Sequence, residues 1–137
     1  MVDFNLQPGV RLHVKPTSRF HVNRILVNFA TPQTVDNPAS RNLLANLLET
    51  STAKYPTQTA FAKALNHLYG ADASASVGRI GYAHTLRVRA EAVDDRFAQP
   101  GVFASLVEIL YQMIFCPLIK DGAFDEATFK TQRQNVV

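Results

Sequence analysis

Apolar and polar residues alternate in four segments of the chain, and this alternation predicts β-strands at 9–15, 20–29, 73–77 and 82–91. Residues 1–8 precede the first strand as a polar lead-in. The segment 20–29 carries apolar residues on both faces, which predicts a strand in the interior of the sheet. A turn is expected at 78–81, so we expect the last two strands to pair as a hairpin.

Apolar residues at helical spacing predict four helices, and residues with capping or helix-breaking chemistry set their ends. In the first helix, Leu43, Leu44, Leu47 and Leu48 form one buried stripe. The predicted helices run from the N-cap Asn37 to Thr50, from the N-cap Thr57 to Gly70, from Val102 to Phe115 before Pro117, and from the N-cap Asp125 to the end of the chain.

Two strands, two helices, two strands and two helices follow one another along the chain. Such grouping predicts an α+β fold, with a mostly antiparallel sheet and helices packed on one of its faces. The 137 residues, 47% of them hydrophobic, suffice for one core. We expect residues 1–137 to form a single N-terminal domain that is incomplete at its C-terminal end, because the last helix has no stop signal.

Charge and cysteine content narrow the classes of function. Fourteen Lys and Arg against eleven Asp and Glu give a net charge of +3, and no basic run concentrates it, so no nucleic-acid partner is expected. The single cysteine, Cys116, cannot form an intrachain disulfide, and the start of the chain has no signal peptide, so we expect the cytoplasm. The most apolar stretch, 102–119, contains Glu108 and Pro117 and predicts a buried helix rather than a membrane span.

The segment Ser40–Thr50, followed by Lys54-Tyr55-Pro56-Thr57, resembles the metal-binding helix of the insulinase/pitrilysin family of zinc metallopeptidases, the inverted zincins that include mitochondrial-processing-peptidase-like proteins. The family reads H-x-x-E-H in this helix. Residues 9–14 are similar to its opening strand and 20–29 to the strand that pairs with it. Further similar segments are Leu68-Tyr69-Gly70-Ala71 and Phe124-Asp125-Glu126 with Phe129 and Arg133, the last resembling the start of the helix that carries the third metal ligand.

The metal-binding positions are changed in this chain. Histidines at i and i+4 lie on one helix face and can hold one Zn²⁺, and the neighbouring Glu activates the metal-bound water. Here the two histidine positions are Asn46 and Thr50, whose amide and hydroxyl are poor zinc ligands. Glu49 stays as a vestigial general base. Because both ligand positions are changed, no cofactor is expected, although active relatives hold zinc. The third ligand position would follow Val137.

Other candidate residues have simpler structural explanations. Glu49 could equally be a solvated carboxylate at a helix end. His13 and His21 could meet across the first hairpin, but surface positions on strands are the better expectation. Arg87 and Arg89, with Arg79 nearby, fit the wet face of a strand better than an anion site. Cys116 has no histidine close in sequence, which favours a small core residue over a nucleophile.

The resemblance implies a non-catalytic homologue that binds peptide along a sheet edge, or that partners a homologous active subunit as a dimer. Whether the chain is an enzyme stays open. One alternative is an active zinc-dependent endopeptidase with its ligands outside this fragment. The other is an unrelated α+β interaction module, which would lack a helix from Asn37 to Thr50 packed on the sheet with Glu49 pointing into a cleft.

Overall fold

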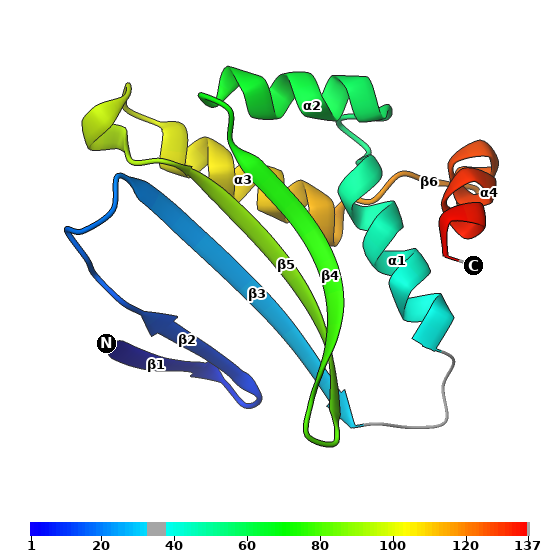
Figure 1. Ribbon diagram of the computed structural model, residues 1–137, viewed down its shortest axis with the longest axis horizontal. Helices are drawn as coiled ribbons and strands as arrows, with labels where there is room; N and C mark the ends of the chain where they lie inside the picture. Colours follow the sequence, from blue (N-terminus) through cyan, green and yellow to red (C-terminus); the bar gives the residue numbers. More distant parts are fainter. Residues whose placement is uncertain (33–37, 137) are drawn as a thin grey trace.

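The computed structural model describes residues 1–32 and 38–136 (Figure 1). It confirms the predicted α+β fold with antiparallel sheets. The N-cap expected at Asn37 lies outside the described residues. The elements are β1 (Val2–Gln7), β2 (Val10–Val14), β3 (Val22–Pro32), α1 (Pro38–Thr50), α2 (Gln58–His67), β4 (Asp72–Ile80), β5 (Ala83–Val93), a 3₁₀ turn (Asp95–Phe97), α3 (Val102–Phe115), β6 (Ile119–Lys120), β7 (Ala123–Phe124) and α4 (Glu126–Asn135).

The main sheet has the strand order β3-β5-β4, and both pairings are antiparallel. The predicted hairpin is confirmed as β4 and β5. The predicted interior position of β3 is wrong, because β5 is the central strand and Leu26 on β3 is 47% exposed. The turn predicted at 78–81 begins later, since residues 78–80 continue β4. A Cβ at Gly78 would lie 3.2 Å from Thr85 Oγ1 on β5, a tight contact that glycine avoids.

The core lies between the main sheet and α3, which passes behind the strands in Figure 1, while α1 runs along the β4 side. Val27, Val88 and Ala75 occupy one register row across the three strands, so their side chains share the face that meets the helices. Val88 is fully buried there, as is Leu106 of α3. The apolar residues at helical spacing on α3 and those at alternate positions of the strands therefore form one apolar layer.

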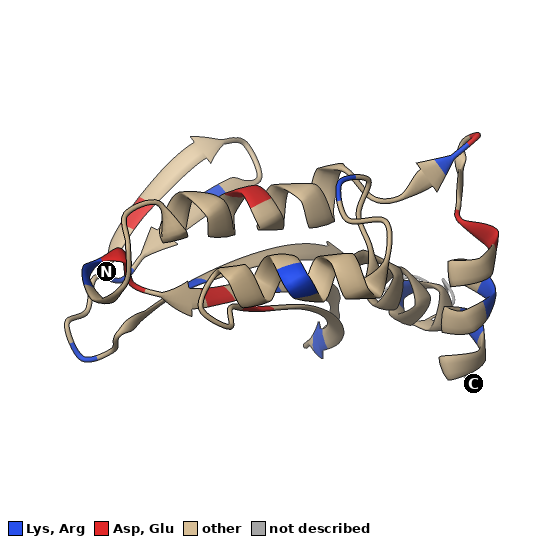
Figure 2. Cartoon of the chain, turned by 90° about the horizontal axis from the view of Figure 1, so that it is seen from above, with Lys and Arg blue, Asp and Glu red and all other residues tan. Residues whose placement is uncertain are grey.

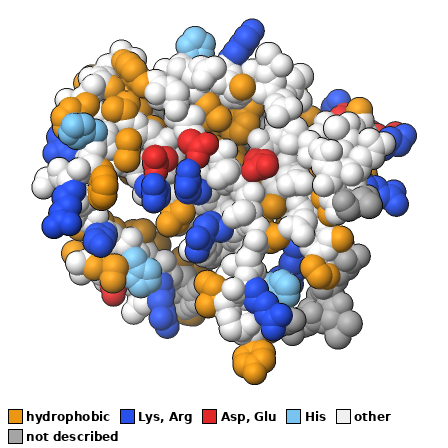
Figure 3. Space-filling view, viewed as in Figure 1, with side chains coloured by type: hydrophobic (Ala, Val, Ile, Leu, Met, Phe, Trp, Pro, Cys, Tyr) orange, Lys and Arg blue, Asp and Glu red, His pale blue; other side chains and the backbone are white. Residues whose placement is uncertain are grey.

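The opposite face of the main sheet is polar. Asp72 of β4 accepts a hydrogen bond from Arg89 at 2.6 Å, and Asn28 of β3 accepts one from Arg87 at 2.8 Å. Figure 3 shows basic and acidic side chains gathered over the sheet on this face. Arg87 and Arg89 thus lie on the wet side of β5, in line with the simpler reading of the sequence.

A separate hairpin is formed by β1 and β2, which pair antiparallel with Phe4 opposite Leu12. The sequence analysis missed β1, and the pairing of 9–14 with 20–29 that the family resemblance implied is wrong. His13 Nδ1 lies 2.7 Å from Asp3 Oδ1 on β1, whereas the His21 ring packs on Phe97 with 4.1 Å between the centroids. The two histidines therefore do not meet across a hairpin.

The predicted N-caps of α2 and α4 are confirmed, whereas α2 ends at His67 and not at the predicted Gly70, because the Leu68 amide bonds the Leu65 carbonyl and closes the helix early. Thr57 accepts a hydrogen bond from the Ala60 amide at the start of α2, and Asp125 accepts one from the Thr128 amide at the start of α4. The hydrogen bonds from Thr128, joined by one from Lys120, lower the pKa of Asp125. In Figure 2, seen from above, acidic and basic residues are sparse along α2 and α3 and denser on α4. Within 1–32 and 38–136, no helix is long and apolar enough to cross a bilayer.

Candidate functional site

The last two turns of α1 carry the residues that the family resemblance singled out. Ala45 and Leu48 of this segment are buried in the core, whereas Asn46, Glu49 and Thr50 are half-buried. Residues at i, i+3 and i+4 share one helix face, so these three side chains lie together. The helix expected by the metallopeptidase resemblance is therefore present and packed along β4, unlike the expectation for an unrelated module.

Glu49 is bound to the edge of the main sheet. Its Oε2 atom accepts a hydrogen bond from the Ala75 amide of β4 at 3.0 Å. Because β4 pairs with β5 on one side only, the Ala75 amide points away from the ladder and would otherwise lack a partner. The carboxylate thus takes the place of a neighbouring strand at this point.

The two positions at which the family resemblance implies metal ligands do not suit a metal ion. Thr50 Oγ1 donates a hydrogen bond to the Asn46 carbonyl oxygen at 2.6 Å, so its hydroxyl is held within the helix. The Asn46 side chain offers only a neutral amide. Neither group is a good zinc ligand, so this helix face does not fit a zinc ion. Throughout residues 1–32 and 38–136, no three His, Cys, Asp or Glu side chains are grouped closely enough to hold a metal.

A hydrogen-bonded loop links α1 to α2. Thr52 is fully buried, its amide bonds the Tyr55 carbonyl at 2.9 Å, and its hydroxyl accepts from the Tyr55 amide at 3.0 Å. The Ala53 amide donates to the Cys116 carbonyl at 2.8 Å, which fixes the loop to the end of α3. Cys116 itself is half-buried at the margin of the core rather than inside it. Loop and helix end therefore hold Lys54 and Tyr55 in a fixed position.

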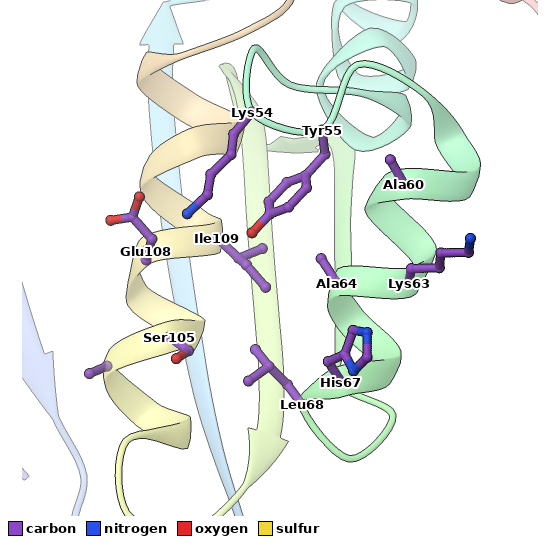
Figure 4. A pocket seen from close by; sticks show the side chains of 11 residues that line it. Lys54, Tyr55, Ala60, Lys63, Ala64, His67, Leu68, Ser105, Glu108 and Ile109 are labelled. Carbon is purple, nitrogen blue, oxygen red and sulfur yellow. The ribbon is translucent and has the colours of Figure 1, made fainter.

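A groove of about 660 Å³ lies between α2 and α3, and sequence reasoning missed it. Figure 4 shows Tyr55 pointing into it from the loop, Ala64 lining it from α2 and Ile109 lining it from α3. Leu68, the C-cap residue directly after α2, also lines it (Figure 4). Small residues at i and i+4 on α2, Ala60 and Ala64, weakly indicate a helix face that no large side chain covers. The partner helix α3 lies about 40 residues further along the chain, so no local pattern announces the groove.

The open edge of β4 is the other feature of this region. Ala75 directs its amide outward, and alternate residues of an antiparallel strand share that orientation. Val77 and Arg79 follow in unbroken register with β5, so their backbone groups also face away from the ladder. The residues from Ser76 to Ile80 are half-buried or exposed. Among residues 1–32 and 38–136, the structure shows no backbone hydrogen bond to these outward groups, so an incoming strand could pair with them.

Comparisons with known proteins place the chain near metallopeptidases. No family model matches it. Over 118 residues it is 25% identical to a Bacillus subtilis (strain 168) protein named "Probable inactive metalloprotease YmfF", covering 85% of this chain and 28% of that protein. A crystal structure of a conserved protein from Enterococcus faecalis V583 superposes with a TM-score of 0.93 at 34% identity, covering 98% of this chain and 32% of the other.

The chain thus spans about a third or less of the length of the proteins it matches. The relationship is metallopeptidase-like, and the curated relative is itself named as inactive. That name agrees with Asn46 and Thr50 standing at the positions where the family resemblance implies histidines.

Proposed function

We propose that this chain belongs to a non-catalytic member of the insulinase/pitrilysin-type metallopeptidases and binds peptide as a partner subunit. The hydrogen bond from the Ala75 amide to Glu49 carries this proposal. This bond gives Glu49 a structural role at the sheet edge, and a general base at this position would still need a metal-activated water, for which the helix lacks two imidazole ligands. With an amide and a hydroxyl at the ligand positions, the helix supports binding and not hydrolysis.

The peptide-binding surface in this proposal is the edge of β4 after Ala75. An extended peptide adds a strand there and bonds to the outward backbone groups of Val77 and Arg79. Main-chain pairing supplies most of the affinity and needs no metal. Ser76 and Gly78 alternate with these residues, so the added strand meets little side-chain bulk next to them. Broad sequence tolerance is therefore expected of the bound peptide.

Peptide hydrolysis, which this chain does not catalyse in our proposal, would be carried out by a homologous subunit that retains its metal ligands. Such a pair forms a dimer in which one member binds peptide and the other cleaves it. The single cysteine is compatible with a reducing compartment, so we place this pair in the cytoplasm.

A proline substitution on the edge of β4 tests the peptide surface. Arg79→Pro removes an outward amide without breaking the ladder to β5, and Arg79→Ala removes the same side chain but keeps the amide. We expect an unfolded, fluorescein-labelled casein peptide to bind the parent and Arg79→Ala alike in fluorescence anisotropy. Binding to Arg79→Pro should be weaker by roughly fivefold or more, for the loss of about one hydrogen bond. Equal binding by both variants would overturn the edge as the site.

Metal analysis tests the loss of catalysis separately. After incubation with zinc and gel filtration, inductively coupled plasma analysis should find well under one zinc per chain. The variant Asn46→His/Thr50→His is the positive control, because it restores two imidazoles at i and i+4. It should retain more zinc than the parent. About one tightly held zinc per unsubstituted chain would refute the non-catalytic assignment and favour an active endopeptidase.

A further inference from the structure

The groove between α2 and α3 has the size and lining of a binding site. Its volume of about 660 Å³ lies in the range of ligand pockets. Ala60 and Ala64 on α2 are small, and Leu68 and Ile109 add apolar surface along the two helices. Figure 4 shows these side chains lining the space between the two helices, with Tyr55 closing one end. The groove is distinct from the β4 edge used in the proposed function.

The charged side chains around the groove are mainly basic. Lys54, Lys63 and His67 line it, and among the described residues none of them has an ion-pair partner. Glu108 is the acidic member of the lining, and its Oε1 atom already accepts a hydrogen bond from Gln112 at 3.0 Å. Two lysines against one carboxylate leave the rim positive even with a neutral histidine. An acidic partner is therefore complementary to it.

The groove is preformed. Its floor residue Ile109 is 3% exposed, and the Tyr55 ring packs on Phe61 with 6.0 Å between the centroids. Lys54 lies with its Nζ atom 5.7 Å from the centroid of that Tyr55 ring. The loop that carries both residues is bonded to the end of α3 through Ala53. The side chains that form these walls would thus not need to become ordered on binding, which lowers the free-energy cost of association.

We propose that this groove docks an acidic amphipathic α-helix of another protein. Two helices form its walls, and a third helix with apolar residues at i, i+3, i+4 and i+7 fits such a groove. The alanines of α2 allow a close approach of its backbone, and flanking Asp or Glu side chains meet Lys54 and Lys63. The ten residues of α2 match a bound helix of roughly three turns.

Charge reversal on the groove rim tests this proposal in the full chain. The probe is a synthetic fluorescein-labelled helical peptide of roughly four turns, with leucines on one face and glutamates on the other, measured by anisotropy at low salt. Lys54→Glu/Lys63→Glu should weaken binding by roughly tenfold or more, because two attractions become repulsions. Lys15→Glu is a control for charge reversal outside the groove, at an exposed lysine in the loop after β2, and it changes the net charge by half as much as the double variant. It should bind like the parent.

Two further measurements distinguish binding in the groove from non-specific electrostatic attraction. Ala64→Trp fills the groove without changing charge and should also abolish binding, while circular dichroism confirms that each variant is folded. A peptide with lysines in place of its glutamates should not bind. The proposal is overturned if Lys15→Glu loses as much affinity as the double variant, or if Ala64→Trp binds normally. It is also overturned if sedimentation shows a dimer of this chain that Ala64→Trp dissociates, because the groove would then hold a second copy.

Discussion

Replacing Glu49 by alanine tests whether this carboxylate holds the sheet edge. In the folded chain its Oε2 atom accepts the Ala75 amide at 3.0 Å, and Ala75 is only 8% exposed. Truncation to alanine leaves that amide without an acceptor. Glu49 is also the penultimate residue of α1, so its charge lies at the negative end of the helix dipole. The two effects of the substitution have opposite signs.

The lost hydrogen bond is the larger effect. A bond to a charged acceptor contributes about 1.5–3 kcal/mol, and most of it is lost when a nearly buried amide is left unpaired. Removing an unfavourable charge at a helix C-terminus returns about 0.3–1 kcal/mol. The net expectation for Glu49→Ala is a loss of about 1–2 kcal/mol in the free energy of unfolding. Glu49→Gln keeps an acceptor and removes the charge, so we expect a change within about 0.5 kcal/mol.

Urea denaturation followed by circular dichroism measures both variants, with Glu108→Ala as a control at an exposed carboxylate of α3. The control should stay within about 0.5 kcal/mol of the parent. A solvated Glu49 with no structural role would make Glu49→Ala neutral or slightly stabilising. That sign, or an equal loss in the alanine and glutamine variants, would refute the role of this carboxylate at the sheet edge.

Two more predictions concern the core and the last helix. Leu106→Ala should lower the free energy of unfolding by about 2–5 kcal/mol in urea, because this fully buried side chain leaves a cavity against the sheet, and a loss below about 1 kcal/mol would contradict the packing. Hydrogen bonds from Thr128 lower the pKa of Asp125 in the fold, so its ionised form stabilises the protein above the ordinary value of 3.8 and this contribution is lost as pH falls. Acid titration of Asp125→Asn should therefore show less loss of stability below about pH 4 than the parent, and identical curves would contradict this assignment.

Features set by neighbouring residues could be predicted from the sequence. Thr57 and Asp125 cap their helices as expected, because a cap bonds an amide only three residues away. Helix α3 has the predicted ends for a similar reason, since Pro117 stops it. The β4–β5 pairing also joins segments that adjoin in the chain. In each case the controlling interaction spans a few residues.

Features set by distant packing could not be predicted in the same way. The Glu49–Ala75 bond joins residues 26 apart, and whether a helix-end carboxylate meets an amide or water depends on how α1 lies along β4. The edge position of β3 could not be predicted, because apolar residues on both faces of a strand usually indicate an interior position. In the structure one of these residues, Leu26, is exposed. The missed strand β1 is different. Val2, Phe4 and Leu6 alternate with polar residues, so the sequence does carry a strand signal in this segment.

The hairpin of β1 and β2 has a consequence for local stability. Within the part of the chain that the structure describes, no other element packs extensively against it, and its apolar residues, such as Phe4 at 47%, remain exposed. Two strands alone are marginally stable in water. The hairpin should therefore open on its own, with its amides exchanging quickly with solvent, while the central strand β5 exchanges only when the whole sheet unfolds. The chain thus behaves as two cooperative units of unequal stability.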